Sequence, residues 1–171
     1  MVKTSWPFVE WTETLSEKDV EKLRVREEVV IGDEVLGNMG VITKVEIFSS
    51  CFQPLSLSIK GDKVLGILAE NRKGEYFYHA LFEDARVGEK KVIEVVIEGK
   101  STIEILKKDG YYSNFAWNTS HVQRIVFPKG WKIFSAIPKG YVLETFEGLP
   151  SIKWVRDGKF WGEVQVKVIK A

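Results

Sequence analysis

One short stretch, YYSNFAWNTSHVQR at residues 111–124, gathers most of the side chains that could bind a ligand. If its first half forms a strand, the side chains alternate between two faces, and we expect the face with three large aromatic rings to be buried. The other face and the start of the next strand would form an exposed polar patch, able to hydrogen-bond a sugar, a peptide or a carboxylate. An ordinary solvated sheet face is the alternative. The predicted ligand-binding residues are Tyr112, Asn114, His121, Gln123 and Arg124.

The two histidines do not predict a metal site. Neither His79 nor His121 has a second histidine or a cysteine at the spacing of a zinc ligand pair. His79 and Glu83 share one face of an expected strand, but four residues of extended chain place them roughly 13 Å apart. We therefore interpret His79 as a hydrogen-bonded residue beside the core, and we expect no metal ion and no cofactor.

No catalytic signature occurs in the sequence. The lone cysteine, Cys51, cannot form an internal disulfide and has no nearby histidine in sequence to activate it, so we expect a buried, inert thiol. The glycine-rich phosphate and dinucleotide motifs and the G-x-S-x-G nucleophile elbow are absent from the sequence. A pair of glutamates for glycoside hydrolysis stays open, because such pairs meet only in the fold. We predict no catalytic residue.

The charge balance excludes some classes of partner. The 171 residues carry 25 basic and 24 acidic side chains, a formal net charge of +1. Such a chain has no electrostatic footprint for nucleic acid or for an anionic membrane. The N-terminal sequence has no signal-peptide core, and no apolar run approaches the roughly 18 residues of a membrane span. We expect a soluble cytoplasmic protein without nucleic-acid or membrane partners, a trimmed extracellular chain being the alternative.

The choice among charged residue types is uneven. The chain has 19 Lys against 6 Arg and 18 Glu against 6 Asp, with only 7 Asn and Gln together. Enrichment in lysine and glutamate with few thermolabile amides is typical of hyperthermophile proteins. We predict a thermophilic protein, and an ordinary Lys/Glu-rich bacterial protein is the alternative.

Residues 1–24 are predicted to form an N-terminal arm with one short helix. The segment LSEKDVEKL has Ser16 as a helix cap and Asp19 three residues on, an acidic variant of the capping box. The arm before it carries three aromatic rings between residues 6 and 11. Rings of this size are too apolar to be left in water, so we expect the arm to pack on the rest of the protein or on a partner.

Residues 25–171 are predicted to form a single antiparallel β domain. Apolar and polar residues alternate, most clearly at 163–168, and no strand pattern is followed by a helix long enough for a βαβ crossover. The expected strands are 25–31, 40–48, 54–60, 63–70, 75–83, 91–98, 101–107, 111–117, 121–127, 131–136, 141–146, 151–156 and 159–169.

Glycine marks the expected turns between these strands. Two Pro-Lys-Gly segments, at 128–130 and 138–140, each precede an aromatic residue and are expected to be turns with glycine in the left-handed conformation. Two-residue hairpin turns are predicted at Gly32-Asp33, Gly61-Asp62, Gly99-Lys100, Asp109-Gly110 and Asp157-Gly158.

These elements favour an all-β fold, an antiparallel β-sandwich built from consecutive hairpins with one short N-terminal helix. An up-and-down β-barrel is the alternative, because consecutive hairpins can also close on themselves.

Without a nucleophile, a metal motif or a phosphate motif, we predict a non-enzymatic binding or protein-interaction module. The alternatives are a barrel-type carrier of an apolar small ligand and a carbohydrate-active enzyme with paired glutamates. The expected partner is a protein, a carbohydrate, or a second copy that binds through the N-terminal arm or an edge strand.

Overall fold

The computed structural model describes residues 2–17, 20–36, 41–50, 53–100, 110–116, 120–157 and 162–170. Within these ranges the chain is built of strands, with no α-helix and a single 3-10 turn, η1 at Asp33–Val35. The strands are β1 Ser5–Thr14, β2 Val20–Val30, β3 Ile42–Ser50, β4 Pro54–Gly61, β5 Val64–Arg72, β6 Glu75–Glu83, β7 Lys90–Lys100, β8 Tyr111–Ala116, β9 Val122–Val126, β10 Trp131–Ile137, β11 Val142–Phe146, β12 Leu149–Val155 and β13 Gly162–Lys170.

The predicted strands agree with this order, with two differences. Strand β1 was not predicted, and the strand predicted at 101–107 lies outside the described residues. Every other predicted strand overlaps an observed one.

The strands form three sheets. The largest has seven strands in the order β11-β12-β9-β1-β2-β7-β4, and the two smaller ones have the orders β10-β13-β8 and β3-β6-β5. Neighbours pair antiparallel except for β1 and β9, which are parallel. None of these described sheets closes on itself, so the barrel alternative is wrong.

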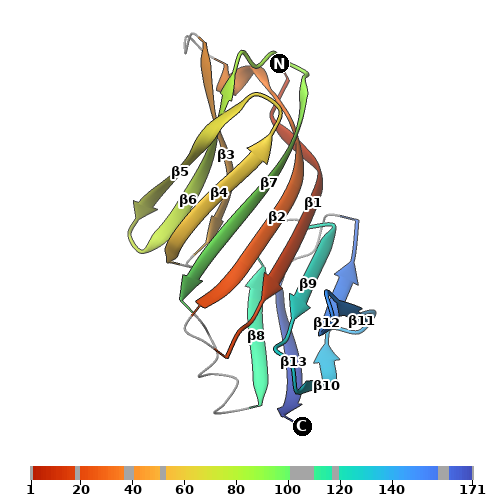
Figure 1. Cartoon of the computed structure of the whole chain (residues 1–171). Helices are drawn as coiled ribbons and strands as arrows, with labels where there is room; N and C mark the ends of the chain where they lie inside the picture. Colours follow the sequence, from red (N-terminus) through yellow and green to blue (C-terminus); the bar gives the residue numbers. More distant parts are fainter. Residues whose placement is uncertain are drawn as a thin grey trace.

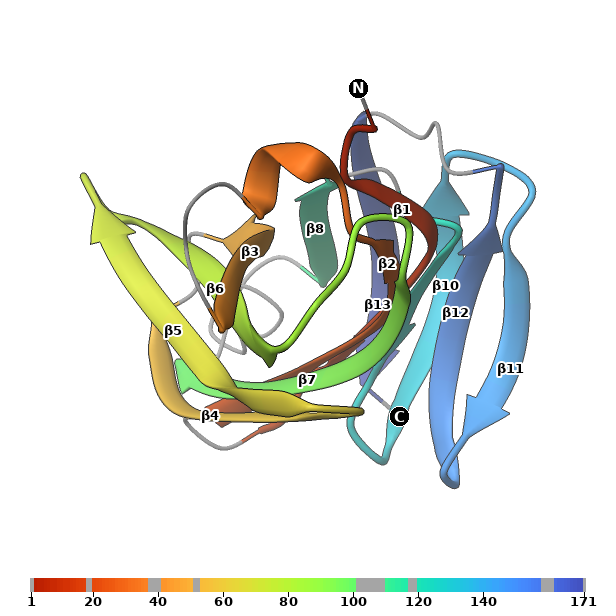
Figure 2. The same ribbon diagram turned by 90° about the horizontal axis from the view of Figure 1, so that it is seen from above.

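The two small sheets cover the same face of the large one, at opposite ends of it (Figure 1). The β3-β6-β5 sheet faces β1, β2 and β7, and the β10-β13-β8 sheet faces β9 and β12. Figure 2 shows β7 and β4 curving beneath β5 and β6 at the first end. The prediction of a β-sandwich is therefore confirmed, in the form of two sandwiches that share one sheet.

Each sandwich has its own core. In the first, Val25 and Val95 of the large sheet face Tyr78 and Phe82 of β6, all fully buried. The ring of Phe48 stacks on Tyr78 with centroids 4.8 Å apart. Burying one such side chain stabilises the fold by about 1.5–3 kcal/mol, so the alternating apolar residues hold the two layers together.

The second core is centred on Trp154 of β12. Its ring is buried, and its Nε1 donates to the carbonyl oxygen of Pro138 at 3.0 Å. The predicted Pro-Lys-Gly turns lie around this core, with glycine φ values of 90° at Gly130 and 92° at Gly140. These φ values confirm the prediction of left-handed glycines. The aromatic residue after each turn packs on the same cluster.

The predicted N-terminal helix is wrong. The segment from Val20 to Val30 is strand β2, paired along its length with β1 on one side and β7 on the other. Its odd-numbered residues are buried and its even-numbered residues are not. A helix of two turns is marginal by itself, so an amphipathic strand with two neighbours is the more stable outcome.

Two predicted hairpin turns are also wrong. Gly32-Asp33 leads into η1, and Gly99-Lys100 belongs to β7, where the two residues pair with Glu21 and Val20. The predicted Gly61-Asp62 hairpin is met only in part: the chain does turn here, but the turn residues are Asp62-Lys63, and β4 and β5 lie in different sheets instead of pairing. The remaining two predicted turns include residues outside the described ranges.

Two hairpins use turns that the sequence did not reveal. Lys73-Gly74 joins β5 to β6, and Glu147-Gly148 joins β11 to β12, with positive φ at both residues of each pair. This is the type I′ geometry, in which asparagine or aspartate normally takes the first position. The first positions here are lysine and glutamate, so composition gave no signal.

The division into an arm of residues 1–24 and a domain of residues 25–171 stays a prediction. The described part of the first range is β1 and the start of β2, and both strands lie inside the seven-stranded sheet. Trp11 of β1 packs on the first core, edge-on to Phe48 at 5.5 Å.

Glu27 places a carboxyl group inside the first sandwich. It lies on β2 between Val9 and Ile93 in the neighbouring strands, and it is only 2% exposed. One of its oxygens, Oε1, has no hydrogen-bond partner. Burial raises the pKa of Glu27 to about 8, so the side chain is protonated in the folded protein at neutral pH.

This carboxyl predicts a stability that depends on pH. Since its folded pKa lies above its unfolded value, its contribution is full below about pH 4.5 and is lost as pH rises through 8. We expect Glu27→Gln to remove this loss, which reaches on the order of 4 kcal/mol near pH 9 at 1.36 kcal/mol per pK unit. Urea unfolding between pH 5 and 9 measures the difference.

The matched control is Glu28→Gln, on the opposite face of the same strand, where the carboxylate is partly exposed and lies 3.7 Å from Lys90 Nζ. That variant should keep the wild-type pH profile. Parallel curves for wild type and Glu27→Gln would contradict the prediction.

Candidate functional site around Arg124

The predicted binding residues do not form one surface. Gln123 and Arg124 are neighbours on β9, so their side chains leave opposite faces of the large sheet. Gln123 points between the layers and Arg124 points outward. The side chain of Asn114 lies outside the described part of the structure. The role of these residues in ligand binding stays a prediction.

Tyr112 was predicted on an exposed face and is instead a core residue. Its ring is 3% exposed and lies edge-on to Phe127, with centroids 6.0 Å apart. The reason is the pairing of β8 with β13, which sets Tyr112 opposite Val166, one of the valines that face the second core. Trp117, which we expected on the buried face, lies outside the described residues.

His121 closes one end of the parallel pairing between β1 and β9. Its backbone N–H donates to the oxygen of Val9 at 2.8 Å, and its ring Nδ1 accepts from the N–H of Val9 at 3.1 Å. The ring also stacks on Phe8, with centroids 5.6 Å apart. His121 therefore satisfies a backbone donor that the strand pairing would leave open.

Gln123 is the least satisfied of the predicted residues. It is 2% exposed and lies between Trp11 and Trp154 in the register of the sheet. Neither the oxygen nor the nitrogen of its carboxamide has a hydrogen-bond partner. Buried polar groups are normally paired, so this position costs stability.

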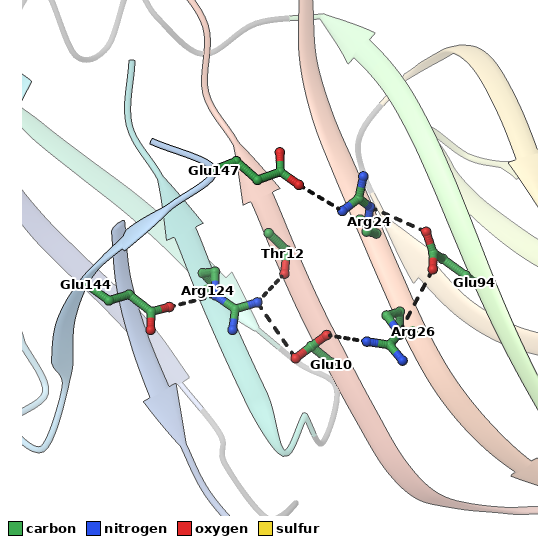
Figure 3. Close-up of polar contacts among 8 residues, drawn as sticks. All are labelled: Glu10, Thr12, Arg24, Arg26, Glu94, Arg124, Glu144 and Glu147. Atoms are coloured by element: carbon green, nitrogen blue, oxygen red, sulfur yellow. Dashed lines mark hydrogen bonds and ion pairs between the residues drawn. The ribbon is translucent and has the colours of Figure 1, made fainter. Parts of the chain in front are cut away.

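Arg124 is the centre of a polar cluster on the outer face of the sheet (Figure 3). Its Nε donates to Glu144 Oε1 of β11 at 2.8 Å, and its NH1 group donates to Thr12 Oγ1 of β1 at 3.0 Å. The same NH1 lies 3.7 Å from Glu10 Oε2. The guanidinium also lies over the ring of Phe146, 4.5 Å from its centroid. Arg124, which belongs to β9, thus contacts both β1 and β11.

Four further residues extend these contacts along the outer face. Arg26 lies 3.6 Å from the second oxygen of Glu10 and 3.9 Å from Glu94. Arg24 lies 3.5 Å from Glu94 and 3.6 Å from Glu147, in the turn between β11 and β12. The network in Figure 3 therefore runs from β11 across β9, β1 and β2 to β7 and returns to the β11–β12 turn.

Glu144 is engaged by two basic side chains, Arg124 and Lys153. Burial alone would raise the pKa of Glu144, but the hydrogen bonds from Arg124 and Lys153 outweigh it and lower the pKa. Glu144 is therefore ionised and fully used, with Lys153 Nζ at 3.1 Å. We assign the Arg124 cluster as a clamp that holds the β11–β12 hairpin on the sheet.

His79 lies on the outer face of the β3-β6-β5 sheet. It is buried, as we expected, but its Nε2 has no hydrogen-bond partner and lies 3.5 Å from Glu70 Oε2. Burial and the nearby Lys44 lower the pKa of the imidazole, against the smaller opposing effect of the two glutamates beside it. Glu70 itself is held by Arg72 at 2.9 Å, so its charge is already paired.

Among the described residues, no three histidine, cysteine, aspartate or glutamate side chains come together in a way that could hold a metal ion. Cys51 lies outside those ranges. Over the same ranges, no helix has the length and apolar character needed to cross a bilayer.

The residues that the sequence did not single out are the partners of Arg124. Glu10, Thr12 and Glu144 are distant in sequence from Arg124, by 112 positions in the case of Thr12. Glu10 and Thr12 meet Arg124 because β1 pairs parallel with β9, and no local pattern predicts a parallel pair separated along the chain by β2 to β8. The aromatic residues of β1 were the one available signal, and they were interpreted as an arm that packs on the rest of the protein or on a partner.

The comparisons with known proteins concern the fold. No protein-family model and no curated protein sequence matches the chain. Two solved structures are similar to it: an M1 zinc metallopeptidase mutant from Deinococcus radiodurans bound to a Tyr-Ser-Ala substrate, and a two-domain M1 zinc metallopeptidase mutant bound to L-tryptophan. Their TM-scores are 0.54 and 0.53, each at 8% identity. Each match covers 95% of this chain and 42% of the other, so the chain spans about two fifths of their length.

The Arg124 cluster predicts a large loss of stability when Arg124 is replaced. Arg124→Met should destabilise the protein by about 3–5 kcal/mol, because it leaves Glu10 and Glu144 without their common partner. Arg26→Met, in the same network but 57% exposed, should cost less than about 1 kcal/mol. Denaturant unfolding compares the two, and equal losses would remove the central role given to Arg124.

The hydrogen bond of His121 predicts that two substitutions at this position differ in stability. His121→Ala leaves the N–H of Val9 without an acceptor, which should cost about 1–3 kcal/mol. His121→Asn also loses the ring contact with Phe8, but its side-chain oxygen can accept the same hydrogen bond. We expect the asparagine variant to be clearly the more stable in urea unfolding. Equal stability would mean that the Val9 bond contributes nothing.

Proposed function

We propose that this chain is a non-enzymatic module that binds another protein, in the way that one part of a larger peptidase-type assembly binds the rest. The supporting comparison is the fold likeness, which takes in nearly the whole of this chain but under half of each metallopeptidase chain. In those proteins a β structure of this shape is thus one part of a longer polypeptide. That likeness concerns the fold alone, so the argument for binding rests on the surface.

The surface that supports the proposal is the outer face of the β10–β13 pair, which we call the basic face. Phe134 lies at a bulge in β10 and is 63% exposed, with Ile137 and Ile169 exposed beside it. Large apolar side chains that gather on one exposed sheet face favour a protein contact. β10 is also an edge strand of its sheet. The outward side chains are Lys132, Phe134, Ser135, Ile137, Glu163, Gln165, Lys167 and Ile169.

The charges around this apolar centre are mostly basic. Lys132 and Lys167 lie on the face, and Lys129 and Lys139 are exposed in the turns at either end of β10, against the one acid Glu163. Lys167 Nζ lies 5.0 Å from the centroid of the Phe134 ring. An apolar centre with a lysine rim matches a partner surface whose own apolar centre is rimmed by aspartate and glutamate. We propose an acidic protein surface as the partner.

The two other functions predicted from the sequence have less support. A carrier needs an enclosed apolar cavity, whereas the described sheets are open and their cores are filled by side chains. A carbohydrate-active enzyme needs a carboxyl group that stays protonated in a cleft. A pocket beside the β4–β5 turn contains Asp84 and Glu89, but the bond from Lys91 lowers the pKa of Glu89 and keeps it ionised.

Self-association is a proposal with less support than binding of a different protein. β1 lies between β2 and β9, so the N-terminal segment offers no free strand edge. A second copy would have to use an edge strand such as β4 or β10, and the exposed Lys60 on β4 works against pairing of that edge.

A photo-crosslinking residue placed at Ser135 tests the proposal in the source cells. We expect crosslinks to one identified protein, mapped by mass spectrometry to a segment rich in aspartate and glutamate. Phe134→Asp should reduce the yield about tenfold, as expected for loss of a central apolar anchor. The matched control places the same residue at Ser58, which is exposed on β4 away from the basic face.

Two outcomes would contradict the proposal. Equal crosslinking from Ser135 and Ser58 would mean that the basic face has no specific partner. Crosslinks to nucleic acid or lipid in place of protein would mean that the partner class is wrong.

A further inference from the structure

A hollow of about 540 Å³ lies at the end of the first sandwich, where the β4–β5 turn meets the loop between β6 and β7. This volume is in the range of sites for small molecules. Its walls are the side chains and backbone of Lys63, Asp84, Arg86, Val87, Gly88 and Glu89. The same end of the molecule carries the N-terminus (Figure 1).

The loop that lines the hollow is fixed by backbone hydrogen bonds to other strands. The N–H of Gly88 donates to the oxygen of Ile31 at 2.8 Å, and the N–H of Ile31 donates to the oxygen of Glu89 at 2.9 Å. On the other side, the N–H of Asp84 donates to the oxygen of Val41 at 2.9 Å. The loop is therefore positioned by the fold before any ligand arrives.

The backbone around the hollow adopts unfavourable conformations. Lys63 and Asp84 both have φ of 53°, and they are two of the four non-glycine residues with positive φ in the described ranges. A side chain in this conformation costs free energy, and such residues gather at functional sites. The conformation of Lys63 belongs to the tight turn between β4 and β5, whereas Asp84 follows β6 outside any two-residue turn.

The charges that face the hollow are unevenly used. Glu89 accepts from Lys91 Nζ at 2.9 Å and from the N–H of Arg86 at 3.0 Å, so both of its oxygens are occupied. In contrast, no hydrogen bond or ion pair within the described ranges involves the side chain of Lys63, Asp84 or Arg86. Two cations and one carboxylate without such a bond thus line the hollow, although the charge of Lys63 also helps to lower the pKa of Glu89.

We propose that this hollow binds a small oxyanion, a carboxylate or a phosphate, on a molecule that also carries a hydrogen-bond donor. Arg86 presents a planar fork that suits two oxygens, and Lys63 adds a second positive charge. Asp84 accepts from the donor of the same ligand. Half-exposed Val87 supplies an apolar contact at the rim. The hollow lies apart from the basic face, so a test of oxyanion binding is independent of the test for a protein partner.

The test uses sodium phosphate, acetate and glycine as probes, with ionic strength held constant by sodium chloride. We expect saturable chemical-shift changes at the backbone amides of residues 84–89 in heteronuclear NMR spectra. A response to phosphate alone assigns the phosphate class, and a response to acetate and glycine assigns the carboxylate class. Glycine should bind better than acetate, because its ammonium group donates to Asp84, and Asp84→Asn should remove that advantage.

The variants separate a built site from general charge attraction. Arg86→Gln should weaken binding about tenfold or more, the usual effect of losing a charged hydrogen bond. Lys60→Gln, an equal loss of charge at an exposed position of β4 outside the hollow, should leave the affinity unchanged. Equal effects of the two variants, or no saturable change with any probe, would overturn the proposal. The spectra also report directly that each variant is folded.

Discussion

Strand β1 connects the two sandwiches, and the rest of the structure depends on its parallel pairing with β9. Its residue Val9 lies in the first core, and Leu15, just past its end, lies in the second. Five residue pairs join it to β9, and beyond them the N–H of Leu15 donates to the oxygen of Val126 at 2.8 Å. Without this pairing the large sheet would divide between β1 and β9, and each small sheet would cover a separate fragment.

The polar residues around this pairing take roles that follow from their position. His121 supplies the acceptor at the start of the pairing, and Arg124 binds Thr12 across it on the outer face. Buried charges and amides rarely contribute net stability by themselves, but removing one partner of a buried pair is expensive. The Arg124 cluster is therefore best understood as a constraint on register. A shift of β9 by one residue along β1 would turn Arg124 inward and separate it from Thr12 and Glu10.

Local patterns in the sequence predicted the strands and the sandwich, because alternation and glycine turns are properties of neighbouring residues. They did not predict which strands meet. The segment 15–23 satisfied the rules for a helix cap, yet residues 20–23 belong to strand β2, because β1 and β7 flank them. Tyr112 was assigned to the wrong face, because the pairing with Val166 that sets its direction comes from a strand at the far end of the chain. The composition signal for a thermophilic protein and the cytoplasmic location stay predictions.

Two polar residues of the predicted patch make contacts between strands in the fold. His121 and Arg124 both bond to β1, whereas Tyr112 is a core residue. Exposed groups gather in two other places that sequence spacing does not reveal. One is the outer face of β10 and β13, where a bulge leaves Phe134 in solvent. The other is the loop after β6, where Arg86 and Lys63 come from two different connections between strands. Both lie away from β1 and β9, so a ligand or partner can bind without disturbing the pairing on which the fold depends.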